Sequence, residues 1–173
     1  MVLTKDELIN SLKDEVRLLL HLVSKAGPQQ LDYRPSPKQR STLELLQYLT
    51  IVGPIHLNVV VSGVFDMVQG AELWGREDAV AKARSFDETV HAIEGLSKNF
   101  ADGISAISDD ELRQPISLFG QTASRGQWLV RLVLSHYTAY RMQLFLWLKA
   151  SGREELNTMN LWAGIDAPMT PPS

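Results

Sequence analysis

The chain has 173 residues, of which 45% are hydrophobic and 21% charged, a composition typical of one globular domain with its own core. Its net charge of −3 comes from interspersed acids and bases, without the Lys/Arg-rich runs that follow a phosphate backbone, so we expect no nucleic-acid partner. The lack of cysteine excludes disulfides, thiolate nucleophiles and Cys-based zinc sites.

The first residues, MVLTKDELINSLKDE, carry charges where a signal peptide requires an apolar stretch. No later segment consists of about 18 uncharged apolar residues, the length that spans a membrane. We therefore expect a cytoplasmic protein that does not interact with a membrane.

Four helix starts are marked by Ser or Thr followed three positions later by Glu or Gln. In this capping box, the two side chains satisfy backbone N–H groups that have no partner inside the helix. Each pair is followed by about 20 residues with apolar side chains at helical spacing, so the sequence predicts four long helices. The pairs are Thr4 with Glu7, Ser41 with Glu44, Ser85 with Glu88, and Ser124 with Gln127.

The first predicted helix covers residues 5–25 and ends before Gly27 and Pro28. The second covers residues 42–68 and contains Pro54, which removes one helical hydrogen bond. We therefore expect a kink near residues 51–54, or else two shorter helices. A polar connector over residues 69–84 is predicted to follow.

The third predicted helix, residues 86–107, is apolar on one side and charged on the other. The connector over residues 108–123 contains the apolar run ISLF, which is typical of a strand-like loop packed against a bundle. The fourth helix, residues 125–150, has almost no polar face, so we expect its own domain or a partner chain to cover it.

Four helices joined partly by long connectors predict an all-α four-helix bundle with crossover connections over residues 1–152. Residues 153–173 contain prolines at positions 168, 171 and 172 and are predicted to form an irregular tail.

Three segments resemble the DinB-like (DinB/YfiT-type) family of four-helix-bundle proteins. YRPSPKQRSTLELLQYL, residues 33–49, is similar to the start of the family's second helix, and ISDDEL, residues 107–112, to the end of its third. SHYTAYRMQLFLWLKASG, residues 135–152, is similar to its fourth helix. The resemblance spans most of the chain and implies the same bundle, a homodimer formed through the bundle helices, and a divalent metal such as Zn or Ni.

The resemblance also implies three metal-binding histidines, one on the second helix and two at positions i and i+4 on the fourth. In this chain those positions hold Tyr48, His136 and Tyr140, so His136 is the retained metal-ligand position. A phenol must lose a proton with a pKa near 10 to bind a metal well, whereas imidazole is neutral at pH 7. We therefore expect no cofactor and interpret the site as degenerate.

Two nearby residues are candidates to replace the lost ligands. Glu44 lies one turn before Tyr48, and His56 lies about two turns after it. On a straight helix, His56 would be about 12 Å from Tyr48, so it needs the kink to reach the same ion.

These observations leave three hypotheses about function. The chain is a DinB-like protein of unassigned activity that binds a small molecule in a pocket near Tyr48, His136, Tyr140, His56 and Glu44. Alternatively, it is a divalent-metal-dependent transferase or hydrolase that uses His136 with non-standard ligands. The third hypothesis is a structural protein that dimerises through its apolar fourth helix.

Three other polar residues have structural explanations. His21 lies near the end of the first helix, where a cation is favourable, and His91 falls on the polar side of the third helix. Arg141 lies in an otherwise apolar helix, so we expect it to pair with an acid from a neighbouring helix or a second subunit.

Overall fold

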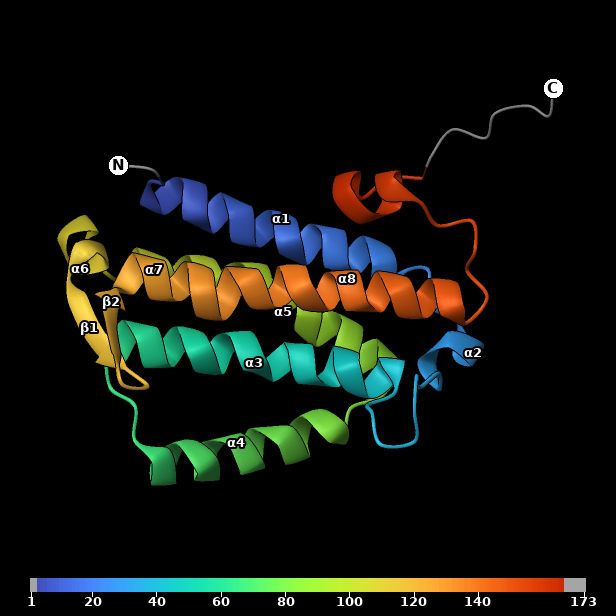
Figure 1. Ribbon diagram of the computed structural model, residues 1–173, viewed down its shortest axis with the longest axis horizontal. Coiled ribbons are helices and arrows are strands. Elements are labelled where there is room, and N and C mark those ends of the chain that lie inside the picture. Colours follow the sequence, from blue (N-terminus) through green and yellow to red (C-terminus); the bar gives the residue numbers. More distant parts are fainter. Residues whose placement is uncertain (1–2, 167–173) are drawn as a thin grey trace.

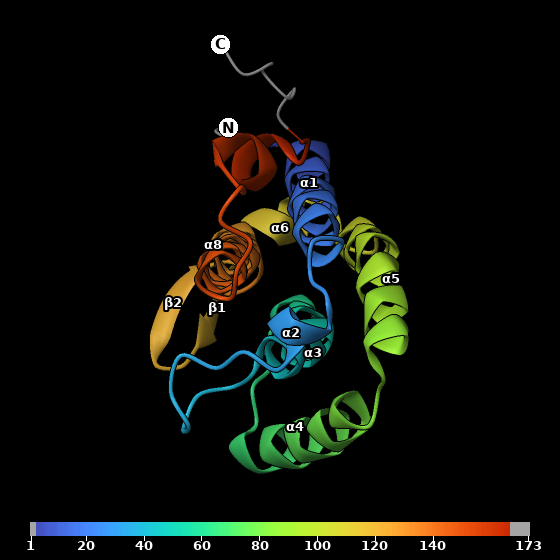
Figure 2. The same ribbon diagram turned by 90° about the vertical axis from the view of Figure 1, so that its right-hand side faces the viewer.

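Within residues 3–166, which the computed structural model describes, four long helices lie side by side (Figure 1). Viewed end-on, α1 lies between α5 and the fourth helix, and α3 packs against the same two helices (Figure 2). The predicted all-α four-helix bundle is therefore confirmed. The helices are α1 (Lys5–Val23), α3 (Thr42–Ser62), α5 (Phe86–Ser105) and a composite of α7 (Arg125–Leu129), the π-helical turn η1 (Val130–Leu134) and α8 (Ser135–Ala150).

The core fills the space between these helices with apolar side chains at helical spacing. Each long helix contributes fully buried residues, among them Leu12, Leu49, Ile93, Leu129 and Leu144. Burying a side chain of this size contributes roughly 1.5–3 kcal/mol of stability. The apolar patterns that predict the four helices are therefore also what packs them together.

α3 is one helix with Pro54 inside it, so the alternative of two shorter helices is wrong. The helix ends at Ser62, earlier than the predicted residue 68. It ends there because Gly63 adopts the left-handed conformation, with φ 71°, that stops a helix. The kink expected near residues 51–54 stays a prediction.

A side chain of the fourth helix reaches the backbone of α3 just before this proline. The hydroxyl of buried Tyr137 donates a hydrogen bond to the carbonyl oxygen of Leu49 at 2.6 Å. The hydroxyl fits because Gly53 has no side chain, and a Cβ at that position would lie 2.5 Å from Tyr137 Oη. Gly53 therefore permits the close approach of α3 to α8.

The predicted polar connector over residues 69–84 is wrong, because most of it forms α4 (Met67–Lys82). Asp66 caps this helix by accepting hydrogen bonds from the backbone N–H groups of Val68 and Gln69, both at 2.8 Å. α4 lies outside the bundle, alongside α3 (Figures 1 and 2). Among its residues, Ala81 alone is buried, so the helix has no apolar stripe from which periodicity could predict it.

The connector after α5 contains the short helix α6 (Asp109–Arg113) and a hairpin of β1 (Pro115–Leu118) and β2 (Gln121–Ser124). The strands are antiparallel, and Phe119 and Gly120 form the turn with φ values of 52° and 74°. Two successive left-handed residues are typical of a type I′ hairpin turn. The strand-like conformation expected for ISLF is therefore confirmed.

The predicted helix starts agree closely with the structure. The capping boxes of Thr4, Ser41 and Ser85 are complete, with both the hydroxyl and the Glu side chain bonded to backbone N–H groups. Ser124 accepts a hydrogen bond from the N–H of Gln127 at 3.2 Å, but no reciprocal box forms there. A further box that we did not predict, at Ser108, starts α6.

Between α1 and α3 lies the short helix α2 (Pro28–Leu31), and after α8 the described chain folds back along α1. In the predicted irregular tail, the structure shows a π-helical turn, η2 (Met159–Ala163). Arg141 holds this turn by donating hydrogen bonds to the Leu161 carbonyl and to Glu15 of α1. The prolines at positions 168, 171 and 172 lie outside the described residues.

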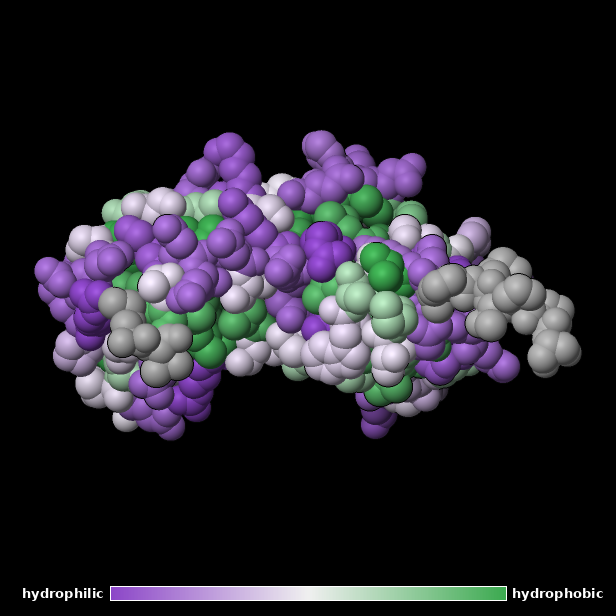
Figure 3. Space-filling model, turned by 90° about the horizontal axis from the view of Figure 1, so that it is seen from above, coloured by the Kyte–Doolittle hydropathy of each residue, from purple (hydrophilic) through white to green (hydrophobic). Residues whose placement is uncertain are grey.

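The molecular surface above α1 and η2 is mainly polar, with apolar patches (Figure 3). Near η2, the exposed apolar side chains are Met159, Trp162 and Ile165. By length and composition α3 would suffice to cross a membrane, but 61% of its apolar window is buried inside the fold. Such burial is typical of a core helix in a soluble protein, and the cytoplasmic location stays a prediction.

Candidate functional site

Four of the five candidate residues meet between α3 and the fourth helix. The ring centroids of Tyr48 and Tyr140 are 5.3 Å apart, and those of His136 and Tyr140 are 5.8 Å apart. At the other end of this row, the rings of His56 and His136 lie 4.9 Å apart and are inclined by 71°. We call these four side chains the ring cluster.

At one end of the ring cluster, the rings of the two tyrosines pack edge to face. Burial raises the pKa of Tyr48, and the hydrogen bond with Tyr140 raises it further. The guanidinium of Arg40 lies over the Tyr48 ring, with its central carbon 4.1 Å from the ring centroid. At neutral pH, Tyr48 therefore remains a protonated phenol and is a poor metal ligand.

At the other end, the orientation of His56 is set by the backbone of the fourth helix. Its Nδ1 lies 2.9 Å from the carbonyl oxygen of Leu132, in the π-helical turn before His136. A carbonyl oxygen only accepts, so Nδ1 carries the proton and Nε2 of the neutral ring has a free lone pair. Burial lowers the pKa of both His56 and His136, which favours their neutral forms.

Glu44 does not join the ring cluster. Its carboxylate accepts two hydrogen bonds from Arg34, at 2.8 and 3.0 Å, and one from the backbone N–H of Ser41 at 2.8 Å. The hydrogen bonds with Arg34 are the main reason why the pKa of Glu44 is lowered. The expectation that Glu44 replaces a lost metal ligand is therefore not supported, because its charge is already compensated.

The metal site implied by the resemblance does not fit these residues. Its three positions hold one imidazole, on His136, and the phenols of Tyr48 and Tyr140. Across residues 3–166, the structure brings no three His, Cys, Asp or Glu side chains together in a metal-binding group. The residues at these positions therefore do not form a three-histidine metal centre.

A pocket of about 350 Å³ opens beside Tyr48, between the loop over residues 34–40, the start of α3, and α4. Tyr48 and Trp74, whose ring centroids are 5.9 Å apart, form an aromatic wall. Lys38 and Arg40 provide positive charge on its lining. We call this the Tyr48 pocket. The sequence analysis did not place Trp74 in this site, because it predicted a connector without a helix over residues 69–84. The run PKQR before α3 was the sequence signal that could have indicated Lys38 and Arg40.

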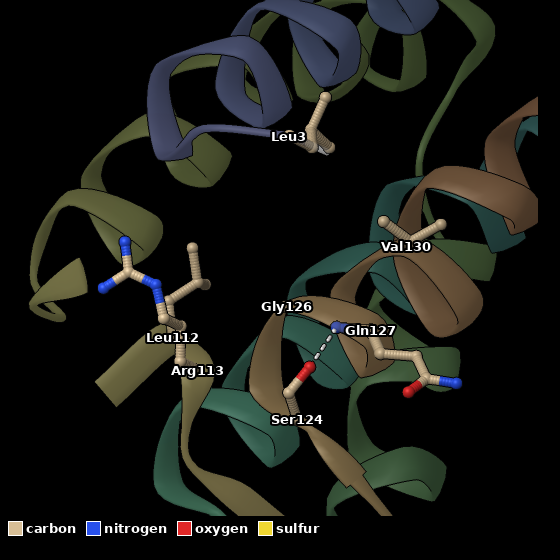
Figure 4. A pocket seen from close by; sticks show the side chains of 7 residues that line it. All are labelled: Leu3, Leu112, Arg113, Ser124, Gly126, Gln127 and Val130. Carbon is tan, nitrogen blue, oxygen red and sulfur yellow. Dashed lines mark hydrogen bonds between the residues drawn. The ribbon is translucent and has the colours of Figure 1, made fainter. Parts of the chain in front are cut away.

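A larger pocket of about 610 Å³ lies at the opposite end of the bundle, where Leu3, Leu112 and Val130 surround the hollow (Figure 4). Its polar groups are engaged locally: the Ser124 hydroxyl caps α7, and Arg113 pairs with Asp110 at 3.1 Å. Among residues 3–166, the lining of this pocket therefore gathers no set of titratable groups for catalysis.

The remaining polar candidates have structural roles. His21 accepts a hydrogen bond from Asn160 at 3.2 Å, which links α1 to the chain beyond α8, and burial lowers the pKa of His21. His91 is exposed and lies 3.3 Å from Glu94 on the same helix. Arg141 pairs with Glu15 of a neighbouring helix, which confirms the first of the two predicted alternatives.

No protein-family model and no curated protein matches this chain. Among solved structures, the crystal structure of the DinB-like protein YjoA from Bacillus subtilis superposes with a TM-score of 0.64. The match covers 87% of this chain and 94% of that chain, at 16% identity. This chain has the DinB-like fold. At this identity the similarity concerns the fold, so the chemistry of the DinB-like bundle must be argued from its own residues.

Proposed function

We propose that this DinB-like protein binds a small aromatic carboxylate in the Tyr48 pocket. The observation that carries the proposal is the charge balance of the lining. Arg34 is paired with Glu44, and Lys82 is paired with Asp78 at 2.6 Å. Within the described part of the chain, Lys38 and Arg40 have no carboxylate within 4 Å, so an anionic ligand would supply their missing partner.

The side chains that line the Tyr48 pocket favour binding of a small aromatic ligand. Tyr48 and Trp74 present ring surfaces beside the two cations, and the volume of about 350 Å³ is at the lower end for small-molecule sites. Arginine binds carboxylates through two parallel hydrogen bonds, which gives both affinity and orientation. A flat ring that carries one carboxylate matches both the walls and the charge.

The test compares salicylate with salicylamide, which has a similar shape but no charge, by isothermal titration calorimetry. We expect wild-type protein to bind salicylate and to bind the amide at least about 10-fold more weakly. Arg40→Gln should weaken salicylate binding by a similar factor, because it removes the charge and its stacked guanidinium. Lys13→Gln, on the exposed face of α1, is the control and should bind like wild type.

Equal binding of salicylate and its amide would contradict the proposal, as would unchanged affinity in Arg40→Gln. Failure of salicylate, benzoate and 4-hydroxybenzoate all to bind would also contradict it. Circular dichroism of each variant establishes that the compared proteins are folded.

The homodimer predicted through the bundle helices is a second proposal. Among the large apolar residues of α8, Leu146 is exposed, while the others are covered within the fold. A larger exposed group lies elsewhere: Phe65 and Phe119, with ring centroids 4.5 Å apart, adjoin the exposed Met67 and Val68. Analytical ultracentrifugation tests the proposal, and a monomer at micromolar concentration would contradict it.

A further inference from the structure

Gln47 contributes a buried, neutral side chain to the Tyr48 pocket. It precedes Tyr48 on α3, is 5% exposed, and lines the pocket between α3 and α4. Its Nε2 donates hydrogen bonds to the carbonyl oxygens of Arg84 at 2.8 Å and Lys82 at 3.4 Å, where α4 ends. Carbonyl oxygens only accept, so the amide nitrogen must face these two groups and Oε1 must face away from them.

Oε1 of Gln47 is an acceptor that the described chain leaves unpaired. Among residues 3–166, no side chain or backbone N–H group donates a hydrogen bond to this oxygen. Nor is it one of the polar atoms that the fold seals from solvent without a partner, and the cavity that Gln47 lines is the Tyr48 pocket. Buried polar groups in proteins are almost always hydrogen-bonded. A ligand in the pocket would therefore meet an acceptor that still needs a donor.

The charged groups on the lining meet the ligand from a different element. Two carboxylates of the lining, Glu44 and Asp78, are held in ion pairs. Lys38 and Arg40 come from the loop before α3, whereas Gln47 is anchored to the end of α4. A ligand that contacts both sides therefore carries its negative charge and its hydrogen-bond donor at separate positions of the ring.

We infer that the ligand of the Tyr48 pocket is an aromatic carboxylate with a hydroxyl or amino group meta or para to the carboxylate, and that Gln47 selects it. Such ligands are a subset of the aromatic carboxylates proposed above, so this step rests on the proposed function. The carboxylate pairs with Lys38 and Arg40, and the hydroxyl or amino group donates to Oε1. The backbone carbonyls hold the amide before the ligand arrives, so little conformational entropy is lost on binding. A site of this kind rejects analogues without the donor, because its acceptor stays unpaired.

The first experiment compares ligands on the wild-type protein by isothermal titration calorimetry. We expect the better of 3-hydroxybenzoate and 4-hydroxybenzoate to bind at least about 5-fold more tightly than benzoate. The corresponding methoxybenzoate keeps the oxygen but lacks the donor, so it should bind no more tightly than benzoate. Salicylate should bind more weakly than the better hydroxybenzoate, because its hydroxyl lies beside the carboxylate and bonds to it.

The second experiment compares Gln47→Met with Thr50→Val. Gln47→Met keeps the length of the side chain but removes the acceptor, so benzoate and the hydroxybenzoates should bind equally. Thr50 is 7% exposed and accepts a hydrogen bond from Arg84 at 2.6 Å, but it is not among the described residues that line the Tyr48 pocket. Thr50→Val loosens the same end of α4 and should keep the preference for the hydroxyl. A purely structural role of Gln47 would weaken all of these ligands and leave their ratio unchanged.

Equal binding of benzoate and both hydroxybenzoates to the wild type would overturn the inference and leave the proposed anion site standing. A preference for the hydroxyl that survives in Gln47→Met, or that the methoxybenzoate shares, would also overturn it. If none of these carboxylates binds, the proposed function fails and the inference fails with it. The ligand series on the wild-type protein does not depend on the folding of any variant.

Discussion

The fourth helix contacts α1 through charged groups and α3 through neutral ones. Toward α1, the side chain of Arg141 is 2% exposed, and its guanidinium pairs with Glu15 at 2.7 Å. Toward α3, the polar side chains are the hydroxyl of Tyr137 and the rings of Tyr140 and His136. Both contacts place polar groups in a poorly hydrated environment, but they meet its energetic cost in different ways.

In the contact with α1, the charge is kept and each of the three guanidinium nitrogens of Arg141 donates a hydrogen bond. Arg141 donates to both oxygens of Glu15 and to the Leu161 carbonyl. In the contact with α3, burial instead shifts pKa values toward the neutral forms: that of Tyr137 is raised, and that of His56 is lowered. In the contact with α1, the polar groups bind one another and stabilise the fold. In the contact with α3, the lone pair on His56 Nε2 is free to bind a ligand.

The largest effect is expected from breaking the charged contact. Glu15→Gln removes the charge that compensates buried Arg141 and should lower the free energy of unfolding by about 3–5 kcal/mol. Urea denaturation measures this loss. Asp14→Asn is the matched control, because its pair with Arg17 is exposed, and it should cost less than about 1 kcal/mol. Equal losses in both variants would show that the buried pair contributes no more to stability than the exposed one.

A smaller effect is expected from crowding the neutral contact. Gly53→Ala places a Cβ 2.5 Å from Tyr137 Oη and 2.7 Å from Phe100 Cζ, so α3 or these two rings must shift. Overpacking of this kind costs about 1–3 kcal/mol. Gly95→Ala on the exposed face of α5 meets no atom within 4 Å and should stabilise the helix by roughly 1 kcal/mol. Thermal unfolding of both variants tests whether Gly53 is required for space rather than flexibility.

The smallest effect is the pH dependence of the neutral contact. The pKa values of His56 and His136 are lowered in the fold, so the unfolded chain takes up protons first as pH falls through about 6.5. Stability should therefore be full above this value and decrease toward pH 5.5, by at most about 1.4 kcal/mol per histidine. His21, whose pKa is also lowered, adds to the same decrease.

Urea denaturation between pH 7.5 and 5.5 measures this slope. The double variant His56→Gln/His136→Gln should flatten it, and exposed His91→Gln should leave it unchanged. A slope that is unaffected by the double variant would mean that the α3 contact is not where these protons bind.

Much of the fold was predictable, because helix starts and helix faces are encoded locally. Ser41 and Ser85 cap the backbone groups that follow them within one turn, and the apolar stripes recur at the helical period. α4 was not predictable by the same means, because it packs one edge on α3 and depends on the cap at Asp66 rather than on a stripe. The candidate site was predicted in part, since Tyr48, His136 and Tyr140 meet, while Glu44 is held by Arg34.

The sequence by itself determined where the four long helices begin, which faces they bury, and that phenols occupy two positions where the family resemblance implies histidines. These features depend on residues within a few positions of one another. The tertiary structure decided which polar groups meet across helices, such as His56 with His136 and Arg141 with Glu15. Those pairs are separated by about 80 and 126 residues along the chain, so their distances follow from helix packing, antiparallel register and the space left at Gly53.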